Sequence, residues 1–293
     1  MDRLICVSIF LCVDCLLCVY LGNILFNPRE TMKVIVITGS TRGIGYGLAD
    51  SFLDHDCAVI VSGRTQESVD AAMTRLGARH DRERIHGWPC DVCDYGQVQA
   101  LWDAAQARFG SIGIWINNAG VGQSQTRIWE QVPDDARIII ATNVIGTVNG
   151  IMVAIPGMLQ QGSGALYNMF GAGSDGFRIP GLALYSTSKR AVSYLTKALV
   201  REVRDLPLIV GAISPGMVIT DLITNQYTDR PQDWERAKRI FSLIADRVET
   251  VTPWLAERIL HNRKNGATIS WLTPTRALGR FLLSPFRKRD IFS

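Results

Sequence analysis

Short apolar runs alternate with amphipathic stretches from Lys33 to Thr220. Several runs are rich in valine and isoleucine and fit strands buried on both faces of a sheet, at 33–38, 58–62, 85–88, 112–116, 165–169 and 208–213. The stretches between them predict helices of crossover length, including 66–76, 133–154 and one that carries Tyr185. This alternation predicts a single doubly wound α/β domain with a parallel sheet.

After Asp221 the pattern changes to helices at 232–245 and 253–262, followed by a last strand at 267–271. The second of these helices is expected to have Thr252 as its N-cap and Pro253 at its first position. An apolar and basic segment follows at 276–286. It fits a core-packing helix with a solvated face and, equally, a contact surface for a membrane or an amphipathic substrate.

Residues 4–22 form an apolar stretch about as long as one membrane span. Asp14 in its middle opposes insertion by roughly 2.5–3.5 kcal/mol, and no small-residue cleavage site follows it. A membrane anchor, an interfacial helix and an upstream extension before Met32 remain as interpretations, and the anchor is favoured. Together with the basic segment 276–289, this stretch predicts membrane association.

Composition and charge exclude some classes of function. An apolar fraction of 47% and a charged fraction of 20% suit a soluble protein with an apolar appendage. The net charge is only +4 and no long basic run occurs, so nucleic-acid binding is not expected. The seven cysteines show no bridging pattern, which favours a reducing compartment. Cys90 and Cys93 lack further ligands at metal spacing, so no metal site is expected.

A glycine-rich turn directly follows the first strand, with the sequence Gly39-Ser40-Thr41-Arg42-Gly43-Ile44-Gly45. Such a turn lets the backbone approach a pyrophosphate at a helix N-terminus, and a turn that needs glycine for packing alone is the alternative. The second strand ends in Arg64, with no carboxylate to accept a ribose 2′-hydroxyl. Arg42 and Arg64 therefore favour NADP(H) over NAD(H), the alternative being that both are only solvated.

Tyr185 and Lys189 are spaced at i and i+4, which places them on one face of a helix. An ammonium beside a phenol lowers the tyrosine pKa, and such a tyrosine can exchange a proton with a carbonyl or an alcohol. Taken alone, the pair is also typical of a solvated helix face. Asn143 is a poor residue for a helix interior, and we expect it to open the 133–154 helix and hold a water.

Between Lys33 and Leu222, these patterns stand in one order: T-G-S-T-R-G-I-G, Asp91-Val92, N-N-A-G at 117–120, Asn143, Y-S-T-S-K and S-P-G-M-V-I-T at 214–220. In this order they resemble the short-chain dehydrogenase/reductase family. The resemblance implies a Rossmann-type domain with Tyr185 as general acid/base, Lys189 on the nicotinamide ribose and Asn143 supporting a relay water. It also implies further contacts to the cofactor: adenine at Asp91 and Val92, the adenosine half at Asn118, Ala119 and Gly120, and the nicotinamide at Pro215, Gly216, Val218 and Thr220.

The substrate-orienting serine of the family falls on Gly171 in this chain, and the nearest hydroxyl belongs to Ser174. Either Ser174 takes that role, which we favour, or backbone amides of the turn hold the carbonyl oxygen. The G-A-G-S at 171–174 resembles the chlorophyll b reductase branch, which uses NADPH to reduce the C7-formyl of chlorophyll b. The expected activity is NADPH-dependent reduction of an aldehyde or ketone in an apolar substrate.

The resemblance divides the chain into an apolar segment (1–32), an NADP-binding catalytic domain (33–222), and substrate-side helices with a basic end (223–293). Residues 1–32 lack the Ser/Arg-rich composition of a plastid transit peptide. This favours a membrane-associated protein on the cytoplasmic side over a plastid location, with a homo-oligomer as one expected assembly. The alternatives are a general lipid or steroid oxidoreductase, alcohol oxidation in reverse, and a catalytically silent NADP-binding partner protein.

Overall fold

The computed structural model describes residues 32–224, 231–283 and 291–292. The expected anchor at 4–22 and the basic residues after 283 lie outside this range. The described residues from Lys33 onward belong to one compact unit.

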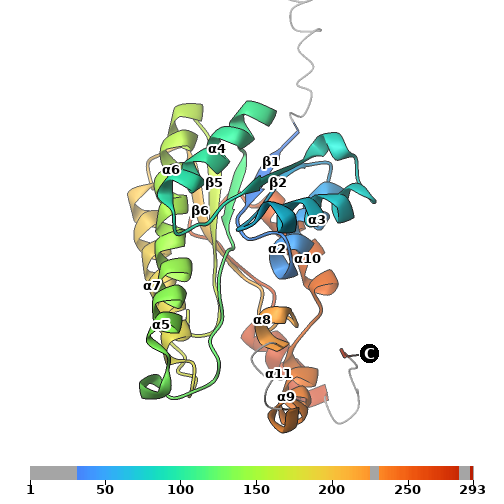
Figure 1. Ribbon diagram of the computed structural model, residues 1–293, viewed down its shortest axis with the longest axis vertical. Helices are drawn as coiled ribbons and strands as arrows, with labels where there is room; N and C mark the ends of the chain where they lie inside the picture. The colour runs from blue at the N-terminus through green and yellow to red at the C-terminus, as the bar shows by residue number, and fades with distance from the viewer. Residues whose placement is uncertain (1–31, 225–230, 284–290, 293) are drawn as a thin grey trace, which may run out of the picture. The chain divides into compact units, whose positions relative to one another are not determined.

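The core of this unit is a seven-stranded sheet in the order β3-β2-β1-β4-β5-β6-β7 (Figure 1). All neighbouring strands pair in parallel, which confirms the predicted α/β class. The order changes direction between β1 and β4, and ligands of such folds bind at the carboxyl ends of the strands beside this point. The strands are β1 (Val34–Ile37), β2 (Ala58–Gly63), β3 (Ile85–Pro89), β4 (Ile114–Asn117), β5 (Gly164–Met169), β6 (Leu208–Ser214) and β7 (Thr268–Ser270).

Helices cover both faces of the sheet (Figure 1). One face packs against α2 (Gly43–Asp54), α3 (Gln66–Gly77) and α10 (Val248–His261). The other packs against α4 (Tyr95–Phe109), α6 (Gly146–Gln161) and α7 (Ala183–Glu202). Within β1, Ile35 and Ile37 belong to the first core and Val34 and Val36 to the second, which explains the continuous apolar run.

The remaining helices complete the ends of the unit. Helix α5 (Pro133–Ile140) runs through a π-helical turn, η3 (Ala141–Ile145), into α6, and two short 3₁₀ turns are η1 (Arg82–Arg84) and η2 (Ile128–Glu130). Figure 1 shows α8 (Asp221–Thr224), α9 (Pro231–Ile244) and α11 (Pro274–Leu283) gathered at one end of the unit. Within the described chain, the Pro133–Gln161 stretch is the one helix long and apolar enough to cross a membrane, and 44% of its apolar window is buried inside the fold.

Helix α11 turns its cations inward and its apolar side chains outward. The Arg276 guanidinium lies 4.1 Å from the Trp271 ring centre, and Arg280 contacts the buried Asp246 carboxylate at 2.8 Å. Leu278 and Leu282 are 60% and 67% exposed. This is the opposite of a core-packing helix with a solvated charged face, so the first interpretation of the segment is wrong for α11. Membrane association through this segment stays a prediction.

Two predicted helix boundaries are wrong. Helix α10 begins at Val248, five residues before the predicted start, and Pro253 lies inside it. Thr252 does not cap it, because its hydroxyl donates to the Val248 carbonyl at 3.0 Å. The cause is packing on α2, where Gly47 has no side chain and lies directly against Val248 and Thr252.

The second error concerns the helix that was predicted to end near Ala154. It continues through Pro156 and ends at Gln161. The next residue, Gly162, has the left-handed φ of 78° that is common after helix termini. Ala154 and Met158 pack against the sheet on either side of the proline. This packing outweighs the hydrogen bond that Pro156 removes.

Candidate active site

Tyr185 and Lys189 lie one turn apart near the start of α7, beside the end of β5. The Lys189 ammonium donates to the Met169 carbonyl at 3.2 Å and lies 5.9 Å from the centre of the Tyr185 ring. Gly171 stands against the phenol, where an added Cβ would collide with the Tyr185 Oη. The pair therefore faces the carboxyl end of β5 and is not part of a solvated helix face.

Burial sets the protonation of both groups. It raises the pKa of Tyr185 to about 12 and lowers the pKa of Lys189 to about 8. The expectation that Lys189 lowers the tyrosine pKa is wrong for this arrangement, because desolvation of the phenol dominates and the ammonium points to Met169. Tyr185 is consequently neutral at pH 7 and able to donate a proton.

Asn143 is fully buried in the π-helical turn η3. Its Oδ1 accepts from the Val121 N–H at 2.8 Å, and its Nδ2 donates to the Val121 carbonyl and to the Ser188 hydroxyl, each at 3.0 Å. The helix thus opens at Asn143 as expected, and π turns of this kind often occur at functional sites. The side-chain amide binds protein groups, so its role toward a water stays a prediction.

Ser174 is buried beside Gly171, and its hydroxyl is bonded within the protein. It accepts from the Gly171 N–H at 3.0 Å and donates to the Lys189 carbonyl at 3.3 Å. These bonds tie the turn after β5 to the helix that carries the lysine. They also occupy the Gly171 N–H, one of the turn amides that were the alternative donors toward a substrate oxygen, and a role for the other amides stays a prediction.

The glycine-rich turn fits the phosphates of a dinucleotide. Gly39 and Gly43 have φ values of 63° and 57°, which L residues rarely adopt. An added Cβ at Gly39 would lie 2.8 Å from the Ala119 Cα. Arg42 precedes α2 and has no acceptor in its side chain, and Gly43-Ile44-Gly45 adds no carboxylate. The first N–H groups of α2 are therefore free of a local acidic partner, as an anion site requires.

Side chains from the ends of neighbouring strands hold this turn in place. Asn118 Nδ2 donates to the carbonyls of Thr38 and Gly39 at 2.8 and 2.9 Å. Ser40 is buried and donates to the Ile37 carbonyl at 2.7 Å. Its side chain and its backbone N–H, which donates to the Ser62 carbonyl at 2.8 Å, therefore both support the loop.

Two other predicted cofactor residues lie beside the turn or beside Lys189. Thr220 carries a methyl group 3.5 Å from the position of a Cβ at Gly43, so the 214–220 segment lies against the turn. Gly120 lies against Asn143 and Lys189, at 3.2 and 3.5 Å from an added Cβ. The other predicted residues of the 214–220 segment are Pro215 and Val218, which are buried, and Gly216, which has a positive φ.

The predicted 2′-phosphate and adenine contacts lie on exposed or half-buried positions, except for Val92, which is buried. Arg64 is exposed, and Arg42 lies 3.9 Å from the Asp221 carboxylate. Asp91 accepts from the Cys93 N–H at 2.9 Å, beside the buried Val92. Sequence reasoning missed Arg75, whose guanidinium donates to the Thr41 carbonyl at 2.7 Å and lies 4.4 Å from the Tyr46 ring centre.

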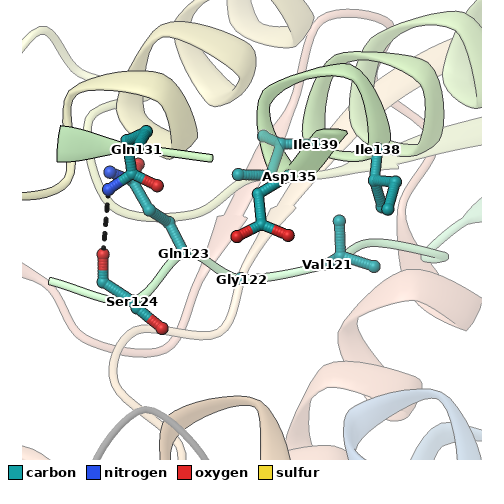
Figure 2. Close-up of a pocket in the computed structure, with 8 residues that line it drawn as sticks. All are labelled: Val121, Gly122, Gln123, Ser124, Gln131, Asp135, Ile138 and Ile139. Carbon is teal, nitrogen blue, oxygen red and sulfur yellow. Dashed lines mark hydrogen bonds between the residues drawn. The ribbon is translucent and has the colours of Figure 1, made fainter. Parts of the chain in front are cut away.

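A small pocket borders the loop after β4 (Figure 2). It lies between Val121–Ser124 and α5, where Asp135, Ile138 and Ile139 face the loop, and its volume is about 170 Å³. Drug-sized ligand sites measure about 300–1,000 Å³. The pocket alone is therefore too small for a large apolar substrate.

Comparison with known proteins places this geometry in a family. A model described as short chain dehydrogenase matches residues 33–231. The probable chlorophyll(ide) b reductase NYC1, chloroplastic, of Arabidopsis thaliana is 33% identical over 276 residues, or 89% of this chain and 54% of the relative. A 3alpha-hydroxysteroid dehydrogenase of Mediterraneibacter gnavus is 34% identical over 191 residues, or 65% of this chain and 76% of the relative. The structure of ElxO with NADP bound has a TM-score of 0.72 at 25% identity, over 82% of this chain and 96% of that one.

The chain spans about half the length of the NYC1 relative. That relative is chloroplastic by name, whereas the composition of residues 1–32 predicts a location outside plastids, so the location stays a prediction. The glycine turn, the Tyr185–Lys189 pair and the parallel sheet agree with the family match over residues 33–231. The chain belongs to the short-chain dehydrogenase/reductase family of NAD(P)-dependent oxidoreductases and is similar within it to chlorophyll(ide) b reductases.

Proposed function

We propose that this protein reduces an aldehyde or ketone of an apolar substrate with NADPH, and that Tyr185 protonates the carbonyl oxygen. The observation that carries the proposal is the half-buried, protonated phenol of Tyr185, which lies beside Lys189 at the carboxyl ends of the strands, where the glycine turn also lies. A phenol protonated at pH 7 is the form that a reductase needs in its proton donor.

The chemistry divides between the cofactor and the chain. NADPH, when bound, supplies a hydride to the carbonyl carbon. Tyr185 gives its phenolic proton to the oxygen as negative charge develops there. Lys189, with a pKa of about 8 and a position next to Gly120, would hold the nicotinamide ribose and help to replace that proton. Asn143 would support this exchange through its bonds to Val121 and Ser188.

Ser174 is the proposed group that orients the substrate oxygen. Its observed bonds to Gly171 and Lys189 support a second role, which is to hold the turn against α7. A Ser174→Ala enzyme with unchanged kcat/KM would remove Ser174 from the reaction altogether.

NADP(H) is the proposed cofactor, held by residues 39–45 and Arg64. The end of β2 bears Arg64 and no carboxylate, and Thr41, the neighbour of Arg42 in the turn, lies against Gly63. An arginine binds the 2′-phosphate that distinguishes NADP from NAD. The NADP-bound ElxO structure supports the same choice.

The formyl group of a chlorophyll b-type pigment is the first proposed substrate, since the NYC1 relative is a probable chlorophyll(ide) b reductase. The outward apolar face of α11 supports a substrate that is itself apolar or embedded in a membrane. In this proposal residues 33–222 bind the cofactor and catalyse, and residues 223–293 form the substrate side. A steroid ketone is the second candidate, because the 3alpha-hydroxysteroid dehydrogenase relative is equally similar in identity.

The direct test measures NADPH oxidation by the purified full chain with three carbonyls: a chlorophyll b-type formyl pigment, a steroid ketone and a long-chain aldehyde. We expect the pigment formyl group to become hydroxymethyl, identified by mass. Reduction of the steroid alone would transfer the assignment to the second candidate. NADPH binding without reduction of any of the three would favour the catalytically silent alternative.

A further inference from the structure

Gln123 joins the loop after β4 to the first turn of α7. Its Oε1 accepts from the Tyr185 backbone N–H at 2.8 Å, and its Nε2 donates to the Gly181 carbonyl at 3.0 Å. The residue is 3% exposed, so these bonds are shielded from water. In Figure 2 it lies on the loop that lines the small pocket, between Gly122 and Ser124.

The start of α7 depends on this contact because the local sequence offers no cap. Leu182 precedes the helix and has no polar side-chain atom, whereas most helices begin with Ser, Thr, Asp or Asn at this position. Tyr185 belongs to the first turn, whose N–H groups have no partner within the helix. Gln123 supplies the acceptor from a loop 62 residues earlier in the chain.

The loop that carries Gln123 is itself fixed from the other side of the site. Asn143 binds both the N–H and the carbonyl of Val121, two residues before Gln123. Asn143 also donates to Ser188, whose hydroxyl donates to the Tyr185 carbonyl at 2.7 Å. The backbone of Tyr185 is therefore held at its N–H through Gln123 and at its carbonyl through Ser188, and both paths lead to Asn143.

We infer that Gln123 is a positioning residue that sets the location of Tyr185 relative to the cofactor-binding loop after β4. The inference rests on the proposed role of Tyr185 as proton donor. Gln123 acts through the Tyr185 backbone and not on the reacting atoms. A displacement of about 1 Å in a reacting group can lower a rate about 100-fold. Loss of Gln123 should therefore lower kcat far more than it weakens cofactor binding.

The test compares Gln123→Leu and Gln123→Glu with Gln125→Leu as a matched control. Gln125 comes from the same loop and donates to the Pro180 carbonyl at 3.1 Å, next to Gly181 but away from Tyr185. Gln123→Glu keeps an oxygen that can accept from Tyr185 and loses the donor to Gly181. For each variant, kcat and KM for the carbonyl, Kd for NADPH and the thermal midpoint are measured, together with Tyr185→Phe.

We expect Gln123→Leu to lower kcat about 10- to 100-fold, with the NADPH Kd and the Gln125→Leu kcat within about twofold of wild type. Gln123→Glu should retain more activity than Gln123→Leu. Wild-type kcat in Gln123→Leu, or an equal loss in both leucine variants, would overturn the inference. If Gln123→Leu does not fold, Gln123→Met, which keeps the length of the side chain and lacks its amide oxygen, decides: a lower kcat at unchanged NADPH Kd supports the inference, and a wild-type kcat refutes it. Full activity in Tyr185→Phe would instead refute the proposed function.

Discussion

The side-chain amide of Asn143 donates a hydrogen bond to the hydroxyl of Ser188 across 3.0 Å, in a region closed to water. Ser188→Ala removes the acceptor and leaves one hydrogen of the buried amide unpaired. We predict a loss of about 1–3 kcal/mol in the free energy of unfolding, together with a lower kcat. Urea unfolding measures the first effect. Thr187→Ala, on the exposed side of the same turn, is the control. Equal stability of the two variants would contradict the prediction.

Gly171→Ala should inactivate the enzyme without abolishing NADPH binding. Its Cβ would collide with the Tyr185 phenol oxygen, so the phenol must move away from the reacting position. We expect kcat to fall by about 100-fold. Gly176→Ala is the control from the same loop. An added Cβ there meets only Arg190 atoms, at 3.8 Å or more, so this variant tests backbone strain at its positive φ of 96° without any contact with the phenol. A comparable kcat in the two variants would show that the phenol tolerates the Cβ.

Replacing Lys189 with methionine should stabilise the protein at pH 7 while it removes a residue of the proposed site. Burial lowers the pKa of Lys189 from 10.5 to about 8, so the folded state holds its ammonium at a cost. Between these pH values the unfolded chain keeps the proton and the folded chain does not, so the stability of the wild type rises with pH through this window.

Lys189→Met also loses the hydrogen bond to the Met169 carbonyl. After this loss is subtracted, we expect the free energy of unfolding of Lys189→Met to exceed that of the wild type by about 2 kcal/mol at pH 7 and by nothing near pH 10. Urea unfolding of both proteins over this range measures the difference. Tyr185 is present in both proteins, so its own raised pKa affects the pH dependence of unfolding in both alike. A gain that did not shrink with pH would show that desolvation of Lys189 is not its source.

The cofactor preference should depend on Arg64. We predict that Arg64→Ala lowers kcat/KM for NADPH about tenfold and leaves kcat/KM for NADH unchanged, since a charge-assisted bond to phosphate contributes about 1.5–3 kcal/mol. The NADH value serves as the internal control for folding and chemistry. Equal losses with both cofactors would mean that Arg64 does not contact the 2′-phosphate.

Features that depend on local pattern could be predicted from the sequence. The strand at Val34–Ile37 is apolar on both faces, so its burial in a parallel sheet follows from the run itself. The shared helix face of Tyr185 and Lys189 follows from their spacing. The helix opening at Asn143 follows from the low helix propensity of asparagine.

Features that depend on residues far away in the chain could not be predicted from the sequence. The early start of α10 needs the contact of Val248 with Gly47, about 200 residues away in the chain. The direction of the Tyr185 pKa shift depends on burial and on where the Lys189 ammonium points, and spacing alone reports neither. Gln123 carries no motif and lies 62 residues from Tyr185, so only the folded arrangement reveals their contact.

The central claim is that Tyr185 donates the proton to the substrate oxygen. It is tested most directly by kcat/KM for carbonyl reduction in Tyr185→Phe, with the NADPH Kd measured on the same sample. A phenylalanine fills the same space but has no proton to give, so we predict a fall of at least about 100-fold in kcat/KM and an NADPH Kd within about twofold of wild type. Wild-type kcat/KM in Tyr185→Phe would contradict the account.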